Sequence, residues 1–235
     1  MGRYNKASHA ASLQETGLKI ATWNVNSIRT RAEHVKAFLE EHAPDVLALQ
    51  EIKVTDDQFP ADFFAEAGYR ATVFGQKTYN GVAFLAPEGS PEAADVVRGF
   101  PGDGGDAHSR LISARFGPVT VVNIYLPNGS EVGSEKYAYK LDWMQRLREW
   151  LDASCDPGEP VVLVGDFNVA PEDRDVYDPE VWRGRILFSD QEKAALETIR
   201  EWGFTDCFRA HHEEDGLYSW WDYRMNQFRR GMGLR

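Results

Sequence analysis

The sequence has little cysteine and no long apolar run. Its 235 residues include two cysteines, Cys155 and Cys207, whose separation is not that of a zinc site. The opening residues lack the apolar centre of a secretory signal, so we expect a cytoplasmic protein with both thiols reduced. No apolar run approaches the roughly 20 residues that cross a bilayer, so we expect no membrane partner.

Positive charge is also scarce. The chain has 26 Lys and Arg against 37 Asp and Glu, which gives a formal charge of −11. That balance alone argues against a nucleic-acid partner, because phosphate binding usually comes with a basic surface. However, Arg224, Arg229, Arg230 and Arg235 gather near the C-terminus, and a divalent metal held by carboxylates would add positive charge. Net charge therefore leaves a DNA partner open without supporting it.

Apolar and polar patterns indicate one domain of α/β class. We expect residues 1–17 to form a disordered polar leader and residues 18–235 to form a single domain, which is long enough to bury a large core. Strands are expected at residues 18–24, 45–50, 69–74, 81–85, 111–116, 119–125 and 161–164. Helices are expected at residues 31–41, 134–151 (with Ser134 as a cap) and 190–202. This mixture predicts a four-layer α/β sandwich, with two mixed β-sheets packed face to face and helices on the outside.

Polar side chains occur at the ends of four expected strands. They are Asn24, Glu51, Tyr125, Asp166 and Asn168. One such Asn or Asp is typically a turn former or a helix cap. Four strand ends with this property favour one shared site.

The chemistry of that shared site follows from its residue types. Glu51 and Asp166 offer hard oxygen ligands suited to Mg²⁺ or Mn²⁺, and Asn24 and Asn168 add amide oxygens and donors. The sequence has neither a phosphate-binding Gly-rich loop followed by Lys and Ser nor a Gly-x-Ser-x-Gly nucleophile elbow. The set predicts attack of metal-assisted water on a phosphate ester.

Five ordered segments resemble the exonuclease III family of abasic-site endonucleases, within the endonuclease/exonuclease/phosphatase superfamily. They are TWNVN at 22–26, PDVLALQEIK at 44–53, NIYLPNG at 123–129, GDFNVAP at 165–171, and the pair DCFR at 206–209 with YSWWDYR at 218–224. The likeness runs from about residue 18 to residue 235. It implies a metal-dependent phosphodiesterase that hydrolyses double-stranded DNA at abasic sites and removes nucleotides from 3′ ends. It also implies that the complete enzyme is a monomer.

The resemblance also implies roles for individual residues. The implied ligands of Mg²⁺ or Mn²⁺ are Asn24, Glu51, Asp166 and Asn168. Asp166 would orient or deprotonate the attacking water, Asn168 would hold the phosphate or water, and Tyr125 would reach the scissile phosphate or the leaving oxygen. The implied DNA contacts are Lys53, Arg110, Asn128 and Trp220.

The sequence departs from the family pattern near its end. Gly233-Leu234-Arg235 resembles the start of a third family signature, which in the family continues with an Asp and later an Asp-His pair on a last strand. None of the six histidines has a matching context, and Gly231 stands where the family usually has Asn. We therefore expect the C-terminal strands to be missing, residues 18–24 to form an exposed apolar edge, and the chain to be impaired as an enzyme.

The sequence leaves two alternatives open. One is a phosphatase or sphingomyelinase-like phosphodiesterase of the same fold, although the segment at 206–223 favours the DNA-acting branch. The other is a non-catalytic DNA-binding protein. The balance between exonuclease and abasic-site cleavage is open.

Overall fold

The computed structural model describes residues 17–102, 108–222 and 226–235. Residues 1–16, which make up most of the expected leader, and Arg224 of the arginine cluster lie outside the described residues. The strands of the two large sheets are β1 (Ile20–Asn24), β2 (Val46–Gln50), β3 (Tyr69–Phe74), β4 (Val82–Pro87), β5 (Ala94–Arg98), β6 (Leu111–Phe116), β7 (Val119–Tyr125) and β8 (Val161–Asp166). The helices are α1 (Ile28–His42), α2 (Ala61–Ala65), α3 (Glu135–Ser154), α4 (Pro179–Trp182) and α5 (Asp190–Arg200). A short ribbon pairs β9 (Trp220–Trp221) with β10 (Gly233–Leu234).

Each large sheet is mixed and has one parallel pair at an edge. The first sheet has the order β1-β2-β4-β3, and the second has the order β5-β6-β7-β8. β1 pairs in parallel with β2, and β7 pairs in parallel with β8, while the other pairs are antiparallel. A parallel pair needs a crossover connection, and α1 and α3 supply the two crossovers.

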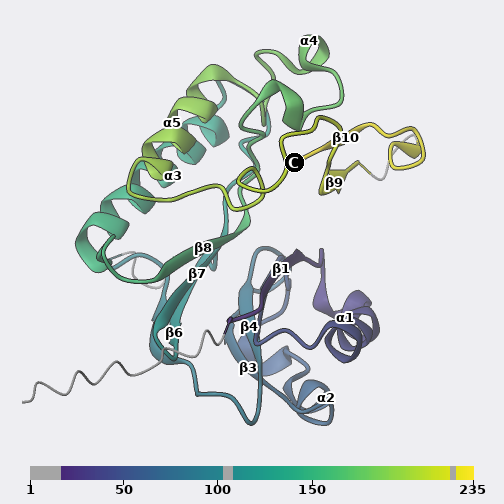
Figure 1. Ribbon diagram of the computed structural model, residues 1–235, viewed down its shortest axis with the longest axis vertical. Helices are drawn as coiled ribbons and strands as arrows, with labels where there is room; N and C mark the ends of the chain where they lie inside the picture. Colours follow the sequence, from purple (N-terminus) through teal and green to yellow (C-terminus); the bar gives the residue numbers. More distant parts are fainter. Residues whose placement is uncertain (1–16, 103–107, 223–225) are drawn as a thin grey trace, which may run out of the picture.

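Four layers result from three apolar interfaces. Val46, Phe84, Ile112 and Val121 pack between the two sheets. α1 and α2 cover the outer face of the first sheet, whereas α3 and α5 cover the outer face of the second (Figure 1). The predicted four-layer α/β sandwich is therefore confirmed.

The helices that cover the second sheet begin at side-chain caps. Ser134 accepts a hydrogen bond from the backbone N–H of Tyr137 at 3.2 Å, which confirms the predicted start of α3. α5 begins with a capping box in which Ser189 and Glu192 bond to one another's backbone N–H groups. These caps fix where each helix leaves the loops around the expected site.

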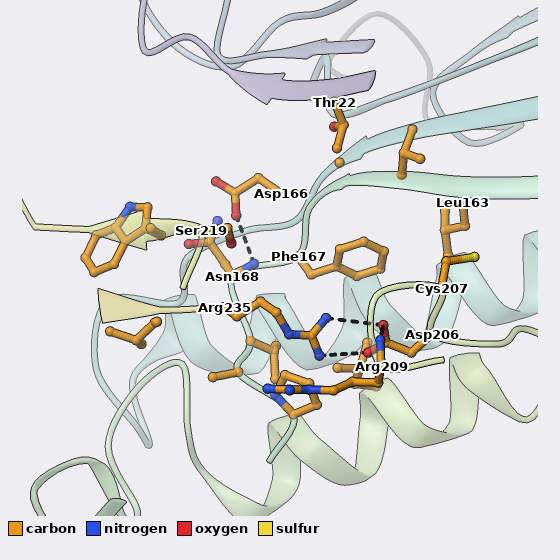
Figure 2. Close-up of a pocket in the computed structure, with 18 of the residues that line it drawn as sticks. Thr22, Leu163, Asp166, Phe167, Asn168, Asp206, Cys207, Arg209, Ser219 and Arg235 are labelled. Atoms are coloured by element: carbon orange, nitrogen blue, oxygen red, sulfur yellow. Dashed lines mark hydrogen bonds and ion pairs between the residues drawn. The ribbon is translucent and has the colours of Figure 1, made fainter. Parts of the chain in front are cut away.

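β1 and β8 each lie at one edge of their sheet. Within the part of the chain that the structure describes, no strand pairs with their free sides. A groove runs along these free sides and is lined by Ile20, Thr22, Val161, Leu163, Asp166 and Asn168, among others (Figure 2). β1 is thus an edge strand, as expected for residues 18–24, although its apolar side chains Ile20, Ala21 and Trp23 are partly buried. We call this hollow the β1–β8 groove.

Neither cysteine is in a disulfide bond. Among the helices of the described ranges, none is both long enough and apolar enough to span a membrane.

Candidate active site

Two carboxylates from different sheets converge on one amide group. Asn24 is the last residue of β1, Glu51 follows β2, and Asp166 is the last residue of β8. The Nδ2 atom of Asn24 donates to Glu51 Oε1 and to Asp166 Oδ2, each at 2.7 Å. The structure therefore brings together three of the five residues for which the sequence predicted a shared site.

Gly165 allows β8 to deliver Asp166 to this position. A Cβ atom at residue 165 would lie 2.0 Å from the carbonyl oxygen of Ile124 on β7, and the backbone has φ +139°. Only glycine tolerates this close approach without a shift of the neighbouring strand. The glycine therefore permits the register that pairs Asp166 with Tyr125.

Backbone strain accumulates around the carboxylates. Glu51 has φ +52°, Lys53 has φ +56° and Asn168 has φ +48°, all in the left-handed region that non-glycine residues rarely adopt. Such conformations cost of order 1–3 kcal/mol each and cluster at functional sites. Their concentration here supports a functional assignment that does not depend on the residue types.

Lys53 faces the site rather than the open rim. Its Nζ atom lies 2.8 Å from Glu51 Oε2, and it also donates to Asn26 Oδ1. The side chain is partly buried. Lys53 therefore balances the charge of Glu51, and its predicted DNA contact would have to be made from beside that carboxylate.

Asn128 and Asn168 lie together on the two loops that follow β7 and β8. Asn128 Nδ2 donates to Asn168 Oδ1 at 3.3 Å, and Asn168 Nδ2 donates to the carbonyl oxygen of Leu126 at 2.9 Å. The backbone N–H of Asn168 donates to Asp166 Oδ1 at 3.0 Å (Figure 2). Asn168 thus orients the Asp166 carboxylate, while its predicted role as a metal ligand stays a prediction.

Arg110 packs over Tyr125. Its guanidinium carbon lies 4.7 Å from the centre of the phenol ring, and Nη1 donates to the Tyr125 carbonyl oxygen at 3.2 Å. The Nε atom of Arg110 is buried and has no hydrogen-bond partner among the described residues. Arg110 is therefore placed to orient Tyr125 as well as to meet an anion.

The two carboxylates have pKa values that shift in opposite directions. Burial by itself would raise the pKa of Glu51, but hydrogen bonds from Lys53 and Asn24 and the charge of Lys53 outweigh it, so the pKa is lowered. Burial raises the pKa of Asp166, against the hydrogen bonds from Asn24 and Asn168. Two acids whose pKa values differ in this way suit different tasks. Glu51 is suited to remain an anion, and Asp166 is suited to take up a proton.

The phenol of Tyr125 stays protonated. Burial raises its pKa well above the ordinary value, and the negative charges of Glu51 and Asp166 raise it further against the charge of Arg110. Tyr125 is therefore a hydrogen-bond donor at neutral pH.

Trp220 lies on the rim of the β1–β8 groove. It is 42% exposed, whereas Trp221 is partly buried, with its ring centre 5.0 Å from that of Phe228. One of the two tryptophans is thus exposed at the groove, and the DNA contact expected of Trp220 stays a prediction.

The carboxylate oxygens of Glu51 and Asp166 that meet at the Asn24 amide are suitable ligands for a divalent cation. Two carboxylate oxygens converge on the polarised N–H₂ group of Asn24, which is where a cation would satisfy both acids. The Asn24 oxygen accepts a hydrogen bond from the backbone N–H of Asn26 at 3.0 Å, so the amide would have to give up this bond to turn its oxygen toward a cation. Among the described residues, no group of three or more His, Cys, Asp or Glu side chains is arranged to hold a metal. Glu51, Asp166 and Asn24 would therefore hold a cation together with water and substrate oxygens, as Mg²⁺ prefers.

A buried ion pair that was not predicted from the sequence lies beneath the site. Lys140 and Glu192 are fully buried, and their side chains contact one another. The sequence does contain a sign of this pair, because Lys140 falls among the buried positions of α3. The other buried positions are Tyr137, Trp143, Met144, Leu147, Trp150 and Leu151. A lysine on an apolar stripe indicates a buried charge with a partner.

Known proteins share both the sequence pattern and the fold. The model of the endonuclease/exonuclease/phosphatase family matches residues 21–235. The chain is 34% identical over 230 residues to exodeoxyribonuclease III of Haemophilus influenzae, which covers 93% of this chain and 85% of the relative. An AP endonuclease from Archaeoglobus fulgidus superposes with a TM-score of 0.87 at 40% identity, over 93% of this chain and 84% of that one.

A second similar structure is that of a protein bound to DNA. A 3′ phosphatase from Neisseria, bound to a product DNA hairpin, superposes with a TM-score of 0.87 at 40% identity, over 93% of this chain and 84% of that one. With a family model that spans the described fold and relatives matched over most of their length, the chain belongs to the endonuclease/exonuclease/phosphatase family, in the group that includes exodeoxyribonuclease III.

Proposed function

We propose that the protein is a metal-dependent DNA hydrolase of exonuclease III type, which cleaves the backbone at abasic sites and acts on 3′ ends. The observation that carries this proposal is the convergence of Glu51 and Asp166 on the Asn24 amide, at 2.7 Å from each. That geometry suits a divalent cation, and no serine or cysteine nucleophile lies among these residues. The relatives include an exodeoxyribonuclease III, an AP endonuclease and a 3′ phosphatase.

Each residue has a task that its environment supports. Glu51, Asp166 and Asn24 would hold Mg²⁺ or Mn²⁺, and the metal would polarise a phosphate oxygen and lower the pKa of bound water. Asp166, with its raised pKa, would take a proton from the attacking water. The Tyr125 phenol, which stays protonated, would donate to the phosphate or the leaving oxygen. Asn168 holds Asp166 in orientation through its backbone N–H.

DNA would approach over the rim of the site. Lys53 and Arg110 would supply positive charge near Glu51, within a chain that is acidic as a whole. Asn128 presents an exposed amide on the loop after β7, and Trp220 presents an exposed ring. An abasic sugar can leave the helix at low cost because no base pair is lost.

The names of the relatives indicate different activities on DNA, so the experiment that tests the proposal compares several DNA substrates. The chain would be incubated with a duplex that carries one abasic site, a duplex with a 3′ phosphate and an intact recessed duplex, with Mg²⁺, Mn²⁺ or a chelator. We expect cleavage at the abasic site that requires a metal and is lost in Glu51→Gln. A matched control is Glu149→Gln, since Glu149 is exposed on α3 away from the site.

Two outcomes would overturn the proposal. Binding of DNA with no metal-dependent cleavage of any of the three substrates would favour the non-catalytic DNA-binding alternative. If Glu51→Gln cleaved as fast as the wild type, Glu51 would not be a metal ligand. The relative rates on the three substrates assign the balance between endonuclease, exonuclease and 3′ phosphatase activity.

A further inference from the structure

A buried lysine joins the two loops that carry the site's asparagines. Lys140 projects from α3, and its side chain is fully buried. Its Nζ atom donates to the carbonyl oxygen of Asn168 at 2.6 Å and to the carbonyl oxygen of Asn128 at 3.2 Å. The third partner of the ammonium group is the carboxylate of Glu192. All three ammonium hydrogens are therefore used, and two of them hold the backbone of the site loops.

Glu192 is anchored on its other side by the start of α5. Its Oε1 atom accepts from the backbone N–H of Leu187 at 3.0 Å, and its Oε2 atom accepts from the backbone N–H of Ser189 at 3.0 Å and from Ser189 Oγ at 2.6 Å. The ion pair thus connects α3, α5 and both site loops. A shift of either loop would have to break a bond to a charged, buried group.

The loop after β7 packs closely against the side chain of Lys140. Gly129, next to Asn128, has φ +88°, and a Cβ atom there would lie 3.0 Å from Lys140 Cδ and 2.8 Å from Ile186 Cδ1. The loop after β7 therefore lies directly on the aliphatic stem of Lys140. Contact at both the stem and the ammonium group fixes the position of Asn128 in two directions.

Stability alone does not account for a charged pair in this place. Two charges lose their hydration when they are buried, and apolar residues of similar volume are often as stabilising. What an apolar pair cannot do is donate hydrogen bonds to two backbone carbonyl groups. The feature that only the lysine supplies is thus the link between the two loops.

We propose that Lys140, held by Glu192, is a positioning residue that keeps the loops at 126–130 and 166–170 in register for catalysis. The inference rests on the proposed function, because the loops carry Asn128 and Asn168. Asn168 in turn orients the Asp166 carboxylate through its backbone N–H at 3.0 Å. Removal of the link should loosen this orientation while the rest of the fold persists.

The test uses the neutral double variant Lys140→Met/Glu192→Gln in the full chain. It removes both charges together, so that no unpaired charge is buried. The control is Lys136→Met, the same substitution one turn earlier on an exposed position of α3. Two experiments are made. The first measures kcat and KM on the abasic duplex, and the second measures amide hydrogen exchange at Leu126, Ser130 and Asn168, whose N–H groups bond within the two loops.

We expect the double variant to melt near the wild-type temperature and to show faster exchange at these three amides. We also expect kcat to fall about 10- to 100-fold with little change in KM, since small misplacements of catalytic groups cost rate of this order. Glu192→Gln alone keeps both carbonyl bonds of Lys140, and we expect it to retain more of kcat than the double variant. Lys136→Met should match the wild type in every measurement.

Wild-type exchange and wild-type kcat in a folded double variant would overturn the inference. Should that variant not fold, Lys140→Gln/Glu192→Gln carries the same test. Its two amides can pair with one another, but the side chain at position 140 is one bond shorter and does not reach both loops. A wild-type chain that cleaves none of the three substrates would defeat the proposed function, whereas hydrogen exchange would still decide whether Lys140 holds the loops.

Discussion

Gln50 on the first sheet donates a hydrogen bond to Asn123 on the second, with 2.7 Å between Nε2 and Oδ1. Both side chains are buried between the sheets. Gln50 immediately precedes Glu51, and Asn123 lies two residues before Tyr125. This bond therefore aligns the sheets directly beneath the candidate active site.

Asn123→Leu should lower the free energy of unfolding. The substitution keeps the approximate volume but leaves Gln50 and the carbonyl oxygens of Leu49 and Ala83 without the Asn123 amide. We expect a loss of about 1–3 kcal/mol in urea unfolding. The double variant Gln50→Leu/Asn123→Leu should lose less than the sum of the two single variants, because neither amide of the pair is left buried without the other. Strict additivity would show that the pair does not couple the sheets.

Asp166→Asn should separate chemistry from binding. The amide keeps the shape of the carboxylate and can still contact Asn24 and Asn168, but it cannot accept a proton from water. We expect kcat on an abasic duplex to fall roughly 10²–10⁴-fold, as for loss of a general base, while the Kd for the same duplex changes little. Equal kcat in variant and wild type would rule out the assigned role, and a large rise in Kd would point to a binding role instead.

Arg110→Ala should weaken binding to duplexes of any sequence. If the guanidinium contacts a phosphate, the slope of log K against log salt should decrease in magnitude by about 0.9. The control is Arg115→Ala, because Arg115 lies near the other end of β6 and pairs with Asp95. A fall in kcat with an unchanged salt slope would show that Arg110 acts only through its contact with Tyr125.

Asp206→Asn should destabilise the fold at neutral pH and not at low pH. Burial alone would raise the pKa of Asp206, but hydrogen bonds from Arg235 and from the backbone of Arg209, with the charge of Arg235, lower it. A lowered folded pKa gives stability that is present above the unfolded pKa of about 3.9 and is lost as pH falls through the folded value. The pair is partly exposed, so we expect a difference of up to about 1 kcal/mol. Urea unfolding at pH 7, 5 and 3 tests this, and a difference independent of pH would contradict it.

The sequence patterns predicted most of the core elements because those elements bury regular apolar faces. β3, β6 and β7 have the expected bounds, and α3 begins after its expected cap. The start of α1 was placed at residue 31, whereas the helix begins at Ile28. The reason is tertiary, since the backbone N–H groups of Ser27 and Ile28 bond to the carbonyl oxygens of Glu51 and Ile52 instead of to a capping side chain.

Other elements lacked a local signal. β5 contains a register shift between Ala94 and Val97, so its side chains do not alternate as a strand pattern requires. The pair β9 and β10 has two residues in each strand, too few for any periodicity. In the candidate site, the strand-end residues were predictable from their order along the chain. The pairing of Lys53 with Glu51 and of Arg110 with Tyr125 depends on side-chain directions that the sequence does not specify.

Glu51 and Asp166 come from opposite halves of the chain, since the first sheet is complete by Pro87 and the second begins at Ala94. Neither half holds the pair of acids that a cation would bridge. A chain that has been synthesised only as far as Pro87 therefore carries Glu51 but lacks Asp166. We therefore expect metal-dependent cleavage only from a chain in which the two sheets have packed together and Glu51 and Asp166 both reach Asn24.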